Sequence, residues 1–180
     1  QNLQRLANFK KIPIATLVVC ILDRPRHEKI IEQARDAGAK VMLIGDGDVS
    51  AIIACADPES GIDMYMGTGG APEGVLAAAA LRCLGGQMEG RLIFRNDTER
   101  ARAAKWGVKD LEKKYTLHEL AGGNVLFAAT GVTDGHMLNG VKRKGNFATT
   151  DSIVMRSESG TVRTIQATHN FNFKDGFEFR

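Results

Sequence analysis

The sequence predicts an α/β fold, in which a mixed sheet lies between helices in a layered α/β/α sandwich. Short apolar runs rich in β-branched residues alternate with helical segments through the first half of the chain. Strands that alternate with helices favour a largely parallel or mixed sheet with helices on its faces. In the second half, two segments alternate polar and apolar residues around a turn, which is typical of a hairpin.

Composition fits one folded domain, since 43% of the 180 residues are hydrophobic and 25% are charged. The net charge of +3 comes from 24 basic and 21 acidic residues that are dispersed along the chain, which argues against a nucleic-acid partner. No run approaches the roughly 20 apolar residues that cross a bilayer, and residues 1–11 lack the order of a signal peptide. We therefore expect a cytoplasmic protein with no membrane partner.

The cysteines lie inside apolar or helical runs, at Cys20, Cys55 and Cys83. This context predicts reduced, buried thiols rather than disulfides or a zinc site.

The first half of the chain begins with helical spacing in residues 1–11, without a capping residue in front. Residues 12–22 are apolar at nearly every position, which predicts a strand covered on both faces. The elements expected next are a helix at 26–37, a strand at 40–44, a turn and helix at 46–56, a strand at 63–66 and a helix at 73–84.

The second half carries weaker signals before its hairpin. We expect a strand at 90–94, a charged helix at 97–106, a short helix at 116–121, a strand at 124–130 and hairpin strands at 150–156 and 161–167. Thr116 and Glu119 fit a capping box. Residues 1–170 are expected to form one domain, and the Phe-rich residues 171–180 either a last strand or an appended tail.

Three polar segments each follow a predicted strand of the first half, where a crevice lies if the strands are parallel. The first is Asp23-Arg24-Pro25-Arg26-His27. Arginine forks match phosphate oxygens bidentately, and the proline fixes the local backbone. A solvated helix start is the alternative, although arginines near a helix N-terminus oppose its dipole. His27 by itself is better explained by a structural role.

The second segment is Asp46-Gly47-Asp48. Its carboxylates are suited to accept hydrogen bonds from sugar hydroxyls or to hold a hard divalent cation, and the glycine allows close approach of a ligand. Alternatively, Asp48 caps the helix that follows. Both roles are compatible.

The third segment, residues 67–74, is a glycine-rich turn into a helix with Pro72 near the first helical position. Exposed amides at such a turn favour an anion. The spacing matches neither a Walker motif nor a dinucleotide fingerprint. Glu73 either complements the helix dipole or binds a metal, and the residues alone leave both open.

Two further clusters have simpler explanations. Turn chemistry explains the polar loop at 130–135 nearly as well as a binding role does, and Lys142, Arg143 and Lys144 fit solvent-facing hairpin charges. No Ser/His/Asp order or Cys/His pair supports covalent hydrolase chemistry.

Between Asn2 and His169, five motifs stand in an order that resembles class II fructose-1,6-bisphosphatases and their sedoheptulose-bisphosphatase relatives. They are LDRPR at 22–26, DGD at 46–48, GGAPEGV at 69–75, CLGG at 83–86 and LFAATGVTDG at 126–135. The resemblance implies the C-terminal part of a lithium-sensitive, metal-dependent phosphatase fold with α/β/α/β/α layers. It also implies removal of the 1-phosphate of fructose 1,6-bisphosphate with Mn²⁺ or Mg²⁺.

By matching position, the resemblance assigns substrate binding to Arg24, Pro25 and Arg26, which would contact the phosphate left in place. It assigns sugar binding to Asp46, Gly47 and Asp48. It assigns a backbone contact to Gly70 and metal ligation to Glu73. The family's other metal carboxylates and its catalytic threonine belong to an N-terminal half that does not precede Gln1 here. Metal-activated water would attack phosphorus in line, so we expect no catalytic residue in this half and no appreciable activity from it alone.

The expected partners are fructose 1,6-bisphosphate, phosphate, the missing N-terminal half and further copies of the chain. A non-catalytic sugar-phosphate-binding or oligomerisation module is the alternative, because an uncovered apolar sheet face drives association. An inositol-phosphate phosphatase of the same superfamily fits the motif order less well.

Overall fold

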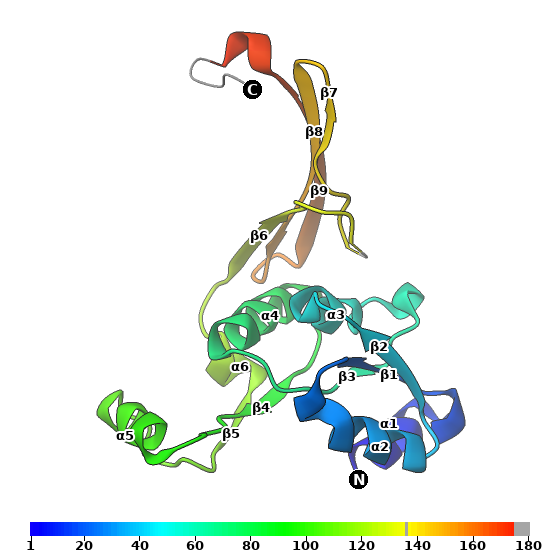
Figure 1. Cartoon of the computed structure of the whole chain (residues 1–180), viewed down its shortest axis with the longest axis vertical. Helices are drawn as coiled ribbons and strands as arrows, with labels where there is room; N and C mark the ends of the chain where they lie inside the picture. Colours follow the sequence, from blue (N-terminus) through cyan, green and yellow to red (C-terminus); the bar gives the residue numbers. More distant parts are fainter. Residues whose placement is uncertain (136, 175–180) are drawn as a thin grey trace.

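Helices and strands alternate over the first 84 residues, as the sequence predicts (Figure 1). The computed structural model describes residues 1–135 and 137–174. It confirms an α/β fold that contains both parallel and antiparallel sheets. The helices of the first half are α1 (Asn2–Lys10), α2 (Glu28–Asp36), α3 (Asp48–Ala54) and α4 (Ala71–Leu84).

Three strands of the first half form a parallel sheet in the order β2-β1-β3. They are β1 (Val18–Leu22), β2 (Lys40–Ile44) and β3 (Met64–Tyr65). The central strand pairs Val18 with Lys40 on one side and Val19 with Met64 on the other. All three strands therefore end at the same edge of the sheet.

The strand expected at residues 12–22 is shorter than the apolar pattern indicates. Ile14–Thr16 forms a 3-10 turn after Pro13, and the strand begins only at Val18. Thr16 donates both its amide and its hydroxyl to the Pro13 carbonyl, at 3.1 and 2.8 Å. Proline has no N–H to give to a sheet, so the chain turns here before it enters β1.

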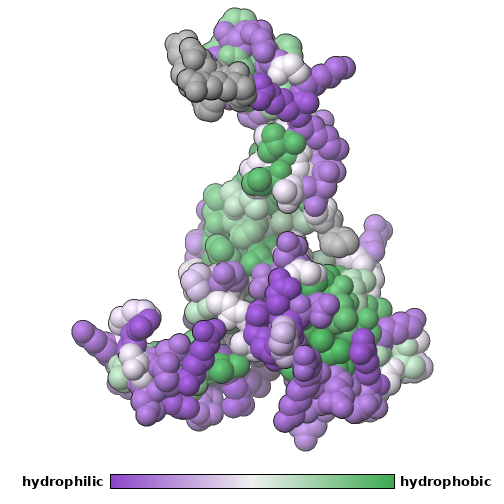
Figure 2. All heavy atoms as spheres, viewed as in Figure 1, coloured by the Kyte–Doolittle hydropathy of each residue, from purple (hydrophilic) through white to green (hydrophobic). Residues whose placement is uncertain are grey.

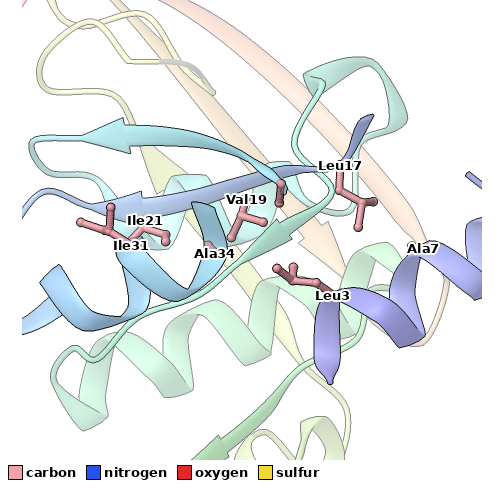
Figure 3. Close-up of a cluster of buried hydrophobic side chains, with 8 residues drawn as sticks. Leu3, Ala7, Leu17, Val19, Ile21, Ile31 and Ala34 are labelled. Carbon is pink, nitrogen blue, oxygen red and sulfur yellow. The ribbon is translucent and has the colours of Figure 1, made fainter. Parts of the chain in front are cut away.

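Apolar side chains of α1, α2 and β1 build the core on one face of the parallel sheet (Figure 3). Leu17, Val19 and Ile21 have no exposed surface. Each fully buried aliphatic side chain of this kind contributes about 1.5–3 kcal/mol. The remaining buried members are Leu3, Ala7, Ile31, Ala34 and Ala39.

The layer of α3 and α4 lies between the parallel sheet and a second, antiparallel sheet (Figure 1). The antiparallel strands are β6 (Leu126–Thr130), β7 (Lys142–Lys144), β8 (Phe147–Arg156) and β9 (Thr161–Asn170). Phe127 and Met155 of this sheet pack against Ile53 of α3 and Ala80 of α4. The described layers are thus helix, sheet, helix and sheet, with the parallel and antiparallel strands in separate sheets.

The hairpin of β8 and β9 is the longest feature of the antiparallel sheet, pairing Phe147 with Asn170 at one end and Arg156 with Thr161 at the other. It extends well away from the base of the molecule (Figure 1). The hairpin expected from the polar–apolar alternation is confirmed, and it is longer than expected. After β9 the chain forms a short 3-10 turn at Phe171–Phe173; the rest of the expected tail, residues 175–180, lies outside the described residues.

The stretch of chain that follows α4 and precedes the antiparallel sheet contains a small antiparallel pair of strands, β4 (Glu89–Arg91) and β5 (Lys114–Thr116). The helix α5 (Asp97–Lys105) connects these two strands, and α6 (Leu117–Leu120) follows β5 directly. The capping box is confirmed, since the Thr116 amide donates to Glu119 Oε2 at 2.9 Å. Neither the sequence pattern nor any motif indicated β5.

The three cysteines are free thiols, as expected. The expected burial is confirmed for Cys20 and Cys83, but it is wrong for Cys55, which is only half-buried. Burial raises the pKa of the Cys55 thiol to about 11, which keeps it protonated. Among the described residues, no helix has the length and apolar character that a membrane crossing requires.

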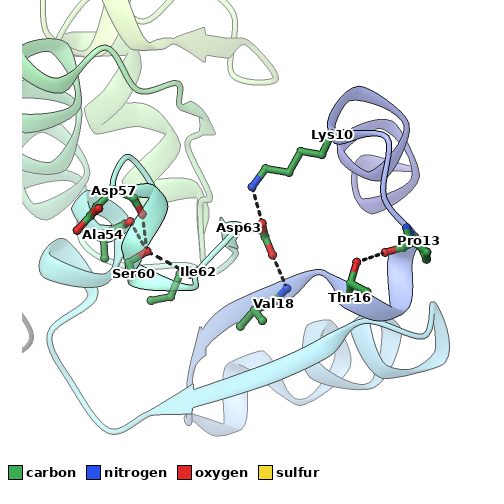
Figure 4. Close-up of polar contacts among 9 residues, drawn as sticks. All are labelled: Lys10, Pro13, Thr16, Val18, Ala54, Asp57, Ser60, Ile62 and Asp63. Carbon is green, nitrogen blue, oxygen red and sulfur yellow. Dashed lines mark hydrogen bonds and ion pairs between the residues drawn. The ribbon is translucent and has the colours of Figure 1, made fainter.

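Asp63 joins three elements at the edge of the parallel sheet where the strands begin (Figure 4). It precedes β3, accepts the Val18 amide of β1 at 2.7 Å and pairs with Lys10 of α1. Burial acts to raise the pKa of Asp63, but the hydrogen bonds from Lys10 and the Val18 amide outweigh burial and hold the pKa below its ordinary value.

The Asp63 contacts make stability depend on pH in a defined direction. A carboxyl whose pKa is lower in the folded state stabilises that state above its unfolded pKa, about 3.9 for aspartate, and the stabilisation is lost as pH falls through the folded pKa. We expect Asp63→Asn to be less stable than the unmodified chain at neutral pH and to lose less stability between neutral and acidic pH. Urea unfolding across this range measures both differences, and parallel pH profiles would contradict the role of Asp63.

Candidate functional site

The three polar segments predicted from the sequence lie together at the carboxyl edge of the parallel sheet. The first follows β1 after Leu22, the second follows β2 after Ile44, and the third follows β3 after Tyr65. Because these strands are parallel neighbours, their following loops meet at one edge. The expected convergence of the segments is therefore confirmed.

Each pair of segments is joined by a side-chain contact. Arg24 Nη2 donates to the carbonyl of Gly45, the residue directly before the second segment, at 2.5 Å, which joins the first segment to the start of the second. Arg26 Nε donates to the Thr68 carbonyl at 2.9 Å, which joins the first to the third. A Cβ built on Gly69 would lie 3.0 Å from Asp48 Oδ2, so the second and third segments are also in contact.

The two guanidinium groups are exposed at this edge. Arg24 also donates from Nη1 to the Asp23 carbonyl at 2.9 Å. Each guanidinium carries five N–H donors in a planar fork. These backbone contacts use only part of each fork, and the remaining donors are suited to an anion such as phosphate.

His27 is fully buried behind the arginines, which confirms the structural role expected for it. Its Nδ1 lies 2.9 Å from the Leu22 carbonyl, and its Nε2 lies 2.9 Å from the Thr68 amide. The neutral tautomer with the proton on Nδ1 satisfies both partners, since Nδ1 donates and Nε2 accepts. The ring therefore ties the end of β1 to the turn that follows β3.

The glycine-rich turn leads directly into α4. Gly70 is the N-cap of this helix, and Pro72 lies in its first turn, as the sequence predicts. A Cβ on Gly70 would lie 2.1 Å from Glu73 Oε2, so the carboxylate of Glu73 folds back over the glycine. Free amides at the start of a 14-residue helix favour an anion.

The segment Asp46-Gly47-Asp48 differs from the expectation that Asp48 caps the helix that follows it. Gly47, with a φ of 77°, is the N-cap of α3, and Asp48 is the first residue of the helix. Asp48 therefore does not cap the helix from the N-cap position. Its Oδ1 accepts the Val49 amide at 3.0 Å, and its Oδ2 faces Gly69. Asp46 is exposed beside it.

Sequence reasoning missed Tyr65, the last residue of β3. A Cβ on Gly67 would lie 3.0 Å from Tyr65 Oη, so the ring lies against the glycine-rich turn. Burial and then the charge of Asp48 raise the pKa of Tyr65 to about 12, while Arg26 acts in the opposite direction. Its position two residues before a glycine-rich turn was the available signal.

The donor set of this chain does not match a complete metal centre. A hard divalent cation takes carboxylate and other oxygen ligands, and Glu73 is of this type. Among residues 1–135 and 137–174, however, no three histidine, cysteine, aspartate or glutamate side chains are grouped to hold a metal ion. The described residues therefore do not form a complete metal site by themselves.

The polar loop at 130–135 folds back on itself at the end of β6. The Gly140 amide donates to Asp134 Oδ1 at 2.9 Å. A Cβ on Gly131 would lie 2.1 Å from the Asn139 carbonyl oxygen, so the two arms of the loop cross closely. Turn chemistry accounts for these contacts. Lys142, Arg143 and Lys144 are exposed, as expected.

Residues 1–169 match a family model described as bacterial fructose-1,6-bisphosphatase, glpX-encoded. A class 2 fructose-1,6-bisphosphatase of Haemophilus influenzae is 43% identical over an alignment of 182 residues, gaps included. The alignment covers 94% of this chain and 55% of the relative. Proteins of Crocosphaera subtropica and a Synechocystis species, both named D-fructose 1,6-bisphosphatase class 2/sedoheptulose 1,7-bisphosphatase, are 42% identical and cover 94% of this chain and 53% of the relative. The chain thus spans about half the length of the curated relatives that it matches.

Proposed function

Because the chain belongs to the family of glpX-encoded bacterial fructose-1,6-bisphosphatases, we propose that it is the substrate-binding part of an enzyme that hydrolyses the 1-phosphate of fructose 1,6-bisphosphate. Two relatives are also named as sedoheptulose 1,7-bisphosphatases. The longer sugar bisphosphate is therefore a second proposed substrate. The setting that we propose is the cytoplasm.

The observation that carries this proposal is the set of contacts that joins the three polar segments at one edge of the sheet. Arg24 and Arg26 offer free guanidinium donors there, and we assign them, with Pro25 between them, to the phosphate that remains on the sugar. The segment 46–48 accepts hydrogen bonds from sugar hydroxyls through its carboxylates. The backbone of Gly70, at the start of α4, makes the remaining substrate contact.

We assign to Glu73 one ligand of a Mn²⁺ or Mg²⁺ ion. When bound in this family of enzymes, such an ion activates water and neutralises charge on phosphorus. The residues of this chain bind the sugar phosphate, hold it against the sheet edge and limit its motion. The other ligands come from outside the described residues.

Calorimetric titration of the 180-residue chain with fructose 6-phosphate, the product of 1-phosphate removal, tests the proposed site. We expect this ligand to bind more tightly than either fructose or inorganic phosphate, because only the sugar phosphate contacts the arginines and the carboxylates together. Absence of binding by fructose 6-phosphate would contradict the proposed function.

We expect the same chain to release no appreciable phosphate from fructose 1,6-bisphosphate in the presence of Mn²⁺ or Mg²⁺. A two-metal hydrolytic site needs several carboxylates, and we assign it only one from this chain, Glu73. Phosphate release measured beside a full-length relative as the positive control gives the comparison. Robust metal-dependent turnover by the chain would show that this division of roles is wrong.

One observation favours an oligomerisation role as a second candidate. Leu126 and Ile165, on the face of the antiparallel sheet turned away from α4, are 68% and 44% exposed. Figure 2 shows hydrophobic side chains gathered over this sheet. Such surfaces favour association, and sedimentation velocity distinguishes a homo-oligomer from a monomer.

A further inference from the structure

Tyr65 lies at the end of β3, beside the glycine-rich turn of the candidate site. Its phenol oxygen contacts Gly67 of the glycine-rich turn, as the 3.0 Å separation from a Cβ built there indicates. The carboxylate of Asp48 and the guanidinium of Arg26 both act on the phenol electrostatically. The turn that the hydroxyl contacts also carries the Thr68 carbonyl, which accepts from Arg26 Nε, and Gly69, which faces Asp48 Oδ2. The hydroxyl therefore lies beside the turn that both the proposed phosphate contact and the proposed sugar contact reach.

The hydroxyl of Tyr65 is available to a ligand. Within the described part of the chain it donates to no protein acceptor, and the side chain is only half-buried. A phenol hydroxyl that is neither bonded nor sealed from solvent has a free donor and a free acceptor. Of the side chains that join the segments, His27 has both ring nitrogens bonded to backbone groups, whereas each arginine keeps free donors.

We propose that Tyr65 is a further substrate-binding residue, whose hydroxyl donates a hydrogen bond to the sugar phosphate at the junction of its phosphate and its sugar. This rests on the proposed function of the same site. The phenol of a tyrosine is protonated at neutral pH and therefore able to donate, and burial and Asp48 raise its pKa further, to about 12. The backbone of Tyr65 is held in β3 by pairing with β1, and its ring lies against the glycine-rich turn.

The chain offers a matched control, because its two tyrosines are Tyr65 and Tyr115. Tyr115 lies on β5, paired with Gly90 and under the ammonium of Lys113. Tyr65→Phe and Tyr115→Phe each remove one hydroxyl and keep the ring. Thermal unfolding of both variants shows whether either change affects the fold itself.

Titration calorimetry with fructose 6-phosphate and, separately, with inorganic phosphate tests the proposal. We expect Tyr65→Phe to weaken fructose 6-phosphate binding by about tenfold and to affect inorganic phosphate less, while Tyr115→Phe changes neither by more than about twofold. Gly67→Ala, whose Cβ would press on Tyr65 Oη, is expected to act in the same direction.

The outcomes separate this inference from the function on which it rests. If the unmodified chain binds fructose 6-phosphate and Tyr65→Phe binds it equally well, the role of Tyr65 is overturned and the proposed site stands. If Tyr65→Phe loses affinity equally for fructose 6-phosphate and for inorganic phosphate, the proposed position of the hydroxyl at the junction of phosphate and sugar is also overturned. If the unmodified chain does not bind fructose 6-phosphate, the proposed function and the role of Tyr65 are both wrong.

Discussion

Replacing both arginines of the first segment, Arg24→Gln with Arg26→Gln, is expected to weaken fructose 6-phosphate binding by about a hundredfold. Hydrogen bonds to charged groups contribute about 1.5–3 kcal/mol each, and two guanidinium groups are assigned to one phosphate. Glutamine keeps a polar side chain but has neither the charge nor the fork. The contacts of Arg24 with Gly45 and of Arg26 with Thr68 are also lost, so the loops around the ligand become less ordered.

A charge-matched control separates phosphate binding from the general charge of the protein. Arg5→Gln with Arg35→Gln removes two positive charges from α1 and α2, away from the strand ends, at exposed positions. We expect this control to bind fructose 6-phosphate within about twofold of the unmodified chain at moderate salt, where distant surface charges are screened. Equal losses in the two double variants would show that Arg24 and Arg26 act only through net charge.

Removal of the buried imidazole, His27→Ala, is expected to lower the free energy of unfolding by about 3 kcal/mol. The change leaves a cavity and deprives the Leu22 carbonyl and the Thr68 amide of their partner. Because His27 ties the end of β1 to the glycine-rich turn, we expect sugar-phosphate binding to weaken as well. Urea unfolding measures the first effect and calorimetry the second.

His118 provides the control for this change, since it is an exposed histidine on α6. His118→Ala is expected to change stability by no more than about 0.5 kcal/mol. A His27→Ala variant as stable as His118→Ala would contradict the inference that the buried ring holds the two segments together.

The convergence of the polar segments could be predicted because it depends on one rule. Parallel strands end at the same edge of a sheet, so apolar runs that end near Leu22, Ile44 and Tyr65 bring the following loops together. The resemblance to class II fructose-1,6-bisphosphatases is confirmed by the family match over residues 1–169. The roles of the individual site residues, including Glu73 as a metal ligand, stay predictions.

Features that depend on the direction of a side chain or on pairing in three dimensions could not be predicted. Tyr65 belongs to the site because its ring lies against Gly67 and near Asp48, and a pattern of apolar residues does not give that direction. The strand β5 is short and polar and exists through its pairing with β4. Pro13 marked the shortened first strand, but hydrophobicity alone favoured a continuous one.

The most direct test of the central claim, that three strand ends form one sugar-phosphate site, is an NMR titration of the isotopically labelled chain with fructose 6-phosphate. The account predicts amide shifts that saturate together in residues 23–27, 46–48 and 65–73, with the hairpin of β8 and β9 unaffected. Shifts confined to one segment, or found only outside these three, would contradict it.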